Sequence, residues 1–216
     1  MSLRIAAMTA LAALTAACAG SPATAPETES AAPVAQQTPA PDAGAELNAL
    51  VDRYFEELLV LNPILATYIG DHRYDDRLPN NIGPEERAKQ HELNERYLAA
   101  ARSIDANALN GADRISLEIF LRERSRALAA ERFPDHLLPI DQTGGLLTVM
   151  PSFGSGTNAQ PFATVEDYDE WLERLDGLIV WMDQAIANMR EGMQKGVVQP
   201  RPVMEKVLPQ LDAMIV

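Results

Sequence analysis

The sequence predicts an all-α protein, and three observations support this fold class. Apolar residues recur at three- and four-residue spacing over long stretches, which is the period of a helix. Residues typical of helix starts and stops bound these stretches. The chain has a single cysteine, Cys18, so no disulfide can form within it, and packed helix faces must supply its stability. We expect one irregular multi-helix domain over residues 44–216.

The first predicted helix covers residues 46–61, where seven apolar residues share one face. These are Leu47, Leu50, Val51, Tyr54, Phe55, Leu58 and Leu59. The following Asn62-Pro63 is expected to stop or kink the helix, because proline lacks a backbone N–H group. Residues 70–79 are polar and are interpreted as a connection.

Two further helices follow this connection. The helix over residues 83–104 starts with Pro84 and two acidic residues, which suit a first turn. Its apolar face is weak, so we expect a surface helix. The next helix covers residues 113–132 and ends at Phe133-Pro134.

Residues 136–160 are predicted to form a long loop, because glycine and proline recur there. The β-favouring run Leu147-Thr148-Val149 predicts a short strand within it. Loops of this length inside a compact domain are often functional.

The clearest helix starts at Thr164, which is followed by an acidic residue three positions later, and it ends at Gly196. Its long apolar stripe is interpreted as core and not as a cofactor site. The stripe comprises Tyr168, Trp171, Leu172, Leu175, Leu178, Ile179, Met182, Ile186 and Met189. A last helix is predicted to open at Pro202 and to break or kink at Pro209.

The N-terminus resembles a bacterial lipoprotein signal. Arg4 precedes an Ala/Leu-rich run over residues 5–14, and small residues lead to Cys18. We expect residues 1–17 to be removed and lipid to be attached to the Cys18 sulfur. Two alternatives stay open, an ordinary cleaved secretory peptide and a short uncleaved anchor. The apolar run is shorter than the roughly 20 residues that a membrane span needs.

Residues 18–43 are rich in Ala, Pro and Thr, and this composition predicts a disordered tether between the lipid and the body. Ala19 replaces the Asp that commonly retains lipoproteins at an inner membrane. In a bacterium with two membranes, the expected location is therefore the periplasmic side of the outer membrane.

The chain is acidic, with a formal net charge of −13 at pH 7. This charge disfavours nucleic acid and anionic lipid headgroups as partners. The expected contact with a membrane is therefore made by the lipid on Cys18 and not by charge.

No complete catalytic constellation is found in the sequence. Zinc hydrolases often carry His-Glu-x-x-His, but the nearest string, His91-Glu92-Leu93-Asn94-Glu95, lacks the second histidine. We interpret His91 and Glu95 as a solvated helix surface. His72 stands among aspartates that typically cap turns. Ser155 lies outside a Gly-x-Ser-x-Gly elbow. No catalytic residue and no metal ligand is therefore assigned.

The order of several short strings resembles the N-terminal part of the bacterial DUF885 family. The resemblance covers about residues 46–216. The strings are Leu61-Asn62-Pro63 with Ala66-Thr67-Tyr68-Ile69-Gly70, Tyr74-Asp75-Asp76-Arg77-Leu78-Pro79, His136-Leu137-Leu138-Pro139-Ile140 with Gln142 and Gly144, Thr164-x-x-Asp167-Tyr168, Trp171-Leu172-x-Arg174-Leu175, and Met189-Arg190-Glu191-Gly192 with Gly196 and Pro200.

The resemblance implies a large helical protein similar to zinc-dependent peptidases of the gluzincin type. The zinc motif of the family lies in a C-terminal half, so zinc is expected for a full-length member and no cofactor for this chain. By analogy, these N-terminal helices form a wall or lid of a substrate channel, with the 136–160 loop facing the cleft.

Three functions stay open. The apolar ending Met214-Ile215-Val216 leads us to expect a truncated chain or one completed by a partner. In the first function, the chain is an inactive N-terminal piece of an exported metallopeptidase that acts on peptides. In the second, it is a stand-alone helical lipoprotein with a binding or scaffolding role. In the third, it complements a separately encoded C-terminal half.

Overall fold

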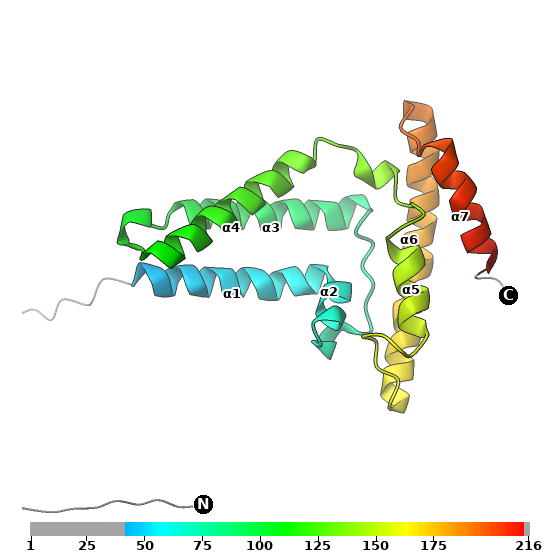
Figure 1. Cartoon of the computed structure of the whole chain (residues 1–216), viewed down its shortest axis with the longest axis horizontal. Coiled ribbons are helices and arrows are strands. Elements are labelled where there is room, and N and C mark those ends of the chain that lie inside the picture. The colour runs from blue at the N-terminus through cyan, green and yellow to red at the C-terminus, as the bar shows by residue number, and fades with distance from the viewer. Residues whose placement is uncertain (1–41, 214–216) are drawn as a thin grey trace, which may run out of the picture. The chain divides into compact units, whose positions relative to one another are not determined.

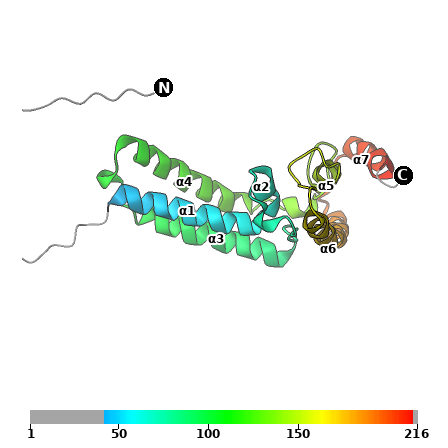
Figure 2. The same ribbon diagram turned by 90° about the horizontal axis from the view of Figure 1, so that it is seen from below.

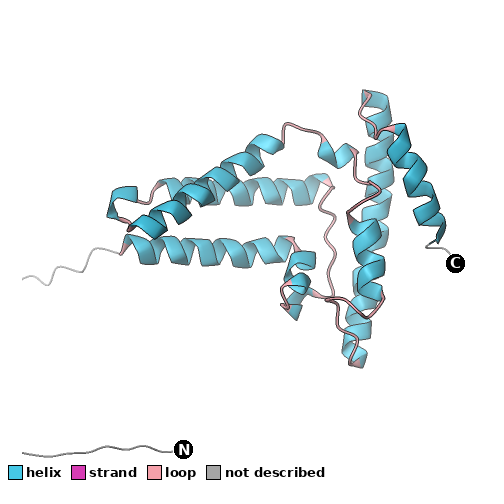
Figure 3. Ribbon diagram, viewed as in Figure 1, coloured by secondary structure: helices cyan, strands magenta, loops and turns pink. Residues whose placement is uncertain are grey.

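The computed structural model of the chain describes residues 42–213, and within this range it contains seven α-helices and no strand (Figures 1 and 3). This confirms the predicted all-α class. The helices are α1 (Ala43–Leu61), α2 (Pro63–Tyr68), α3 (Pro84–Arg102), α4 (Gly111–Ala130), α5 (Leu146–Gly154), α6 (Val165–Lys195) and α7 (Arg201–Ala213), and single 3₁₀ turns are η1 (His72–Tyr74), η2 (Ala106–Ala108) and η3 (Asp135–Leu137). The predicted leader, Cys18 and the tether up to residue 41 lie outside the described residues.

Helices α1, α3 and α4 pack side by side around the first core (Figure 2). Tyr54 of α1 stands edge-on to Tyr97 of α3 and Phe120 of α4, with ring centroids 5.2 and 5.1 Å apart. Helix α3 buries one face against both neighbours and leaves most of its other residues exposed, in agreement with the expected surface helix. The buried face is only weakly apolar because it includes the polar Asn94 and the small Ala101.

A short helix that the sequence pattern did not predict follows directly after α1. Asn62-Pro63 stops α1 as expected, but α2 then begins at once with Pro63 in its first turn. Proline suits this position because its missing N–H group would have no helical partner there. At the other end, the side chain of Asp42 accepts the N–H of Gly44 at 3.0 Å, and α1 therefore starts three residues before the predicted position.

The predicted strand at Leu147-Thr148-Val149 is wrong, because these residues belong to α5. A short apolar run does not by itself distinguish a strand from a buried helix. Here Met150 and Phe153 are buried on one side of the helix, and no strand among the described residues offers a partner. The 136–160 segment is thus a loop with η3 and α5 within it.

Helix α6 has the predicted start and end. Thr164 and Asp167 form a reciprocal capping box, and Gly196 ends the helix in the left-handed conformation at φ 72°. Helix α7 continues past Pro209 to Ala213, so the predicted break is wrong, and the alternative of a kink at Pro209 stays a prediction. The two helices share a second core that includes Trp181, Ala185 and Val207.

The interpretation of the α6 stripe as core is only partly correct. Tyr168, Leu172, Ile179 and Ile186 are exposed. The buried face of the helix includes Arg174 and Asn188 instead. Among the described residues, no helix has both the length and the apolar character needed to cross a membrane.

Candidate functional site

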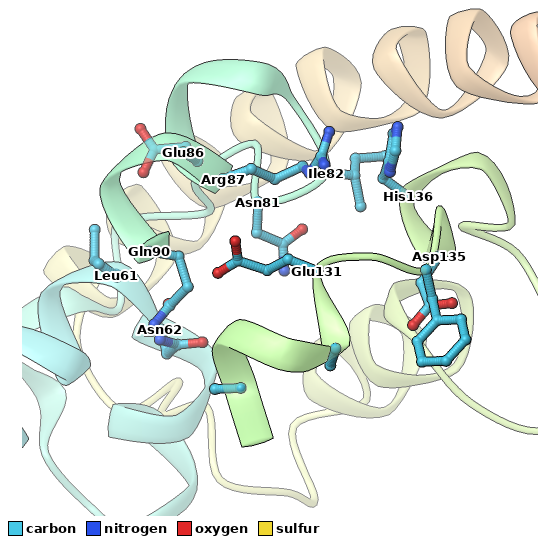
Figure 4. A pocket seen from close by; sticks show the side chains of 13 residues that line it. Leu61, Asn62, Asn81, Ile82, Glu86, Arg87, Gln90, Glu131, Asp135 and His136 are labelled. Carbon is cyan, nitrogen blue, oxygen red and sulfur yellow. The ribbon is translucent and has the colours of Figure 1, made fainter. Parts of the chain in front are cut away.

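A hollow of about 420 Å³ lies where the end of α1, the start of α3, the end of α4 and η3 come together (Figure 4). It combines carboxylates, an arginine, a histidine and amide side chains with a largely apolar surface. Its lining residues are Leu61, Asn62, Asn81, Ile82, Glu86, Arg87, Gln90, Ala127, Ala130, Glu131, Phe133, Asp135 and His136.

One end of the hollow carries Arg87 and His136. Burial and the positive charge of Arg87 hold the pKa of the His136 imidazole below its ordinary value. The imidazole is therefore neutral at pH 7, with one nitrogen able to donate and the other able to accept a hydrogen bond. Arg87 remains the fixed positive charge at this end.

Glu131 supplies a negative charge to the same hollow. Its Oε2 atom lies 2.7 Å from Nδ1 of His91, which belongs to α3. The Glu131 carboxylate raises the pKa of His91, with a smaller effect from Glu95. His91 thus holds a carboxylate in place at the rim of the hollow.

Asn188 of α6 joins two walls of the hollow from behind. Its side-chain amide donates to the backbone oxygen of Ile82 at 3.0 Å and to that of His136 at 2.9 Å. Gln184 in turn donates to the Asn188 side-chain oxygen at 2.8 Å. The sequence did not single out Asn188, because this residue stands within an apolar stripe. Its position three residues after Ala185 and seven after Trp181 could have indicated that it lies on the buried face of α6.

A second polar cluster is buried at the N-terminal part of α6, and Arg174 is its centre. Both Arg174 and Asp75 have fully buried side chains. The Arg174 guanidinium donates to Gln160 Oε1 at 2.6 Å, Tyr74 O at 2.7 Å and Thr67 Oγ1 at 2.9 Å, and it lies 3.4 Å from Asp75 Oδ1. These bonds tie α2, η1 and the 155–163 segment to α6.

His72, which the sequence places among aspartates, contacts only one of them closely. Its Nδ1 lies 2.7 Å from Asp75 Oδ2, and its side chain is half-exposed. Asp71 caps η1 and binds Arg73 instead. The Asp75 carboxylate thus contacts His72, Thr67 and Arg174 at the same time, and these contacts fix the backbone of η1.

The described residues do not fit a zinc ion. His91 contacts two carboxylates: its Nε2 atom lies 3.3 Å from Oε2 of Glu95, and its Nδ1 atom lies 2.7 Å from Oε2 of Glu131. The two carboxylates therefore lie on different sides of the imidazole ring and do not converge on one metal position. Within residues 42–213, no group of three or more metal-ligating side chains converges. The Ser155 hydroxyl donates a hydrogen bond to the backbone oxygen of Ser152 at 2.7 Å. No hydrogen bond within residues 42–213 joins Ser155 to a histidine.

The family assignment rests on a match over most of the body. The family model described as bacterial protein of unknown function, DUF885, matches residues 63–216. The chain belongs to the DUF885 family. No curated protein and no solved structure matches it. The DUF885 match begins at α2, so it includes the Arg174 cluster and most residues of the hollow.

Proposed function

We propose that this chain is the N-terminal helical region of an exported DUF885 protein of the zinc-dependent peptidase class, and that the 216 residues alone are inactive. The observation that carries the proposal is the family match over residues 63–216. The chain contains no His-Glu-x-x-His string, and the histidine and carboxylates nearest to one do not fit zinc. The role proposed for the described residues is therefore contact with the substrate and not metal binding.

The hollow is the proposed surface for a peptide. Arg87 and neutral His136 at one end suit a carboxylate or carbonyl oxygen, and Glu131 suits a peptide ammonium group. Asn62 and Gln90 offer amides that match the donors and acceptors of a peptide backbone. Concave sites with a few convergent polar groups are the usual places for small ligands.

Export and anchoring through Cys18 complete the proposal. They are supported by the leader-like residues 1–17 and by the Ala/Pro/Thr-rich segment that follows. We expect Cys18→Ser to move the protein from the membrane fraction to the released fraction. A matched control, Ser21→Ala, leaves it at the membrane. Equal release of both variants would contradict lipidation at Cys18.

The test of the family role is the intact mass of the native, membrane-extracted protein, together with the DNA that follows codon 216. A mass well above that of the lipidated 216-residue chain, or a downstream frame with His-Glu-x-x-His, supports a peptidase region. A mass equal to the lipidated chain, with no such frame, favours a stand-alone helical lipoprotein with a binding role.

The hollow is tested by peptide binding to the purified chain. Arg87→Gln is expected to weaken the binding of short peptides with free termini by about tenfold, which corresponds to one charge-assisted contact. Arg122→Gln, on an exposed part of α4, serves as the control and leaves binding unchanged. Equal affinity of the two variants for these peptides would contradict the proposal that the hollow binds peptides.

A further inference from the structure

Helix α6 exposes a row of large apolar side chains at intervals of seven residues. The row consists of Val165, Leu172, Ile179, Ile186 and Met193, which are 79, 60, 63, 39 and 71% exposed. It runs from the first residue of α6 almost to its end at Lys195. A contiguous exposed apolar row of this kind marks an interaction surface more often than an isolated apolar residue does.

A second apolar row runs beside the first, displaced by three residues. It consists of Tyr168, Leu175, Met182 and Met189. Tyr168 is exposed and the other three are partly buried. Together the rows alternate at three and four residues, which is the pattern of a seam between two packed helices. We call these nine residues the α6 seam.

The body of the protein covers only one edge of the α6 seam. The face that α6 buries is rotated away from it and includes Arg174, Trp181 and Asn188. Met182 and Met189 pack in the second core with α7. The seven-residue row itself is left exposed.

Acidic residues border one side of the α6 seam. Asp169, Asp176 and Asp183 follow this rim at seven-residue intervals, and Glu166 and Glu173 lie farther out on the same side of the helix. All five are exposed. Among the ion pairs of residues 42–213, none involves these five side chains. Their charges are therefore available to a partner.

We infer that the α6 seam docks an amphipathic helix of a partner protein whose apolar residues alternate at three and four positions and whose flanking positions carry Lys or Arg. Apolar contact supplies the affinity, and the acidic rim selects a basic partner. A second copy of this chain is a poorer occupant, because antiparallel copies centred near Ile179 would bring Asp176 opposite Asp183 and place two negative charges together. This inference does not depend on the peptidase proposal.

The test uses two designed helical peptides of about four heptads with Leu along the seam, one flanked by Lys and the other by Glu. Binding of each labelled peptide to the purified full chain is measured by fluorescence anisotropy at low and high salt. The Lys peptide is expected to bind at least tenfold more tightly than the Glu peptide, and added salt should reduce this difference. Equal binding of the two peptides, or no binding of the Lys peptide, overturns the inference.

Two variants locate the surface. Leu172→Gln with Ile179→Gln is expected to weaken the Lys peptide at least tenfold. Ile115→Gln with Ile119→Gln is the matched control, because these α4 residues are 59 and 47% exposed and lie outside the seam. Since all four side chains are exposed, circular dichroism should show unchanged helicity in both variants. Equal loss in the two variants would overturn the assignment to α6.

A charge reversal separates selective docking from general apolar adhesion. Asp176→Lys with Asp183→Lys is expected to reverse the preference toward the Glu peptide. An unchanged preference overturns the role of the acidic rim. Sedimentation of the full chain tests the other occupant: a dimer that the Leu172→Gln and Ile179→Gln changes abolish would make a second copy the partner and overturn the proposal.

Discussion

Replacing Arg174 with methionine tests whether its buried cluster holds α6 to the first half of the body. Methionine fills a similar volume but donates no hydrogen bond. The change removes the bonds to Gln160, Tyr74 and Thr67 and the ion pair with Asp75. The buried Asp75 carboxylate then keeps only its contacts with Thr67 and His72.

The expected loss of stability follows from this geometry. Removing one partner of a buried ion pair costs about 3–5 kcal/mol, because the other charge stays buried. Since Asp75 keeps two partners, we expect about 3 kcal/mol. For a domain of this size, 1 kcal/mol shifts Tm by about 2–4 °C, so the loss corresponds to about 6–12 °C.

The assay is urea unfolding followed by circular dichroism, with thermal unfolding as a second measure. Arg122→Met, at an exposed site, is the control and is expected to change stability by less than about 0.5 kcal/mol. Arg174→Met combined with Asp75→Leu should cost less than the two single changes added together, because no unpaired charge remains. A loss below about 1 kcal/mol for Arg174→Met, or simple additivity, would refute the reasoning.

Three further predictions concern stability. Hydrogen bonding to Arg96 lowers the pKa of Glu57 to about 2, so the contribution of Glu57 to stability is present above about pH 4.5 and is lost as the pH falls toward 2. Glu57→Gln should reduce the loss of stability in acid by no more than about 1 kcal/mol, because the Glu57 side chain is 43% exposed. An unchanged acid titration of stability would count against this pair. Gly177→Ala should lower urea-measured stability by about 1–3 kcal/mol, because an added Cβ would lie 2.7 Å from the backbone oxygen of Leu78, and no loss would show that the contact relaxes freely. Thr164→Ala should cost about 1 kcal/mol by the same assay through loss of the N-cap hydrogen bond, and an increase in stability would contradict that role.

Helices α1 and α6 could be predicted because their signals are local. Apolar spacing defines both, and the Thr164 cap and Gly196 stop fix the ends of α6. Helix α2 was missed because Asn62-Pro63 ends one helix and starts the next at the same place. The strand prediction at Leu147-Thr148-Val149 was wrong because β-branched residues favour a strand only where another strand can pair with it.

Tertiary packing explains the remaining differences. The weak apolar pattern of α3 reflects a buried face on which Asn94 and Ala101 stand beside the large apolar residues. Arg174 and Asp75 are 99 positions apart, and nothing local pairs them. His136 belongs to one of the strings that carry the family resemblance, but its place in the hollow depends on a hydrogen bond from Asn188, which the sequence places within an apolar stripe.

The proposal that the 216-residue chain alone is inactive is tested by the zinc content and the peptide hydrolysis of the purified chain. Zinc is measured by mass spectrometry after dialysis, and hydrolysis is followed on a mixture of unmodified peptides. We expect far less than one zinc per chain and no hydrolysis above the background of a sample without protein. One tightly held zinc per chain, with hydrolysis that a chelator abolishes and added zinc restores, would contradict it.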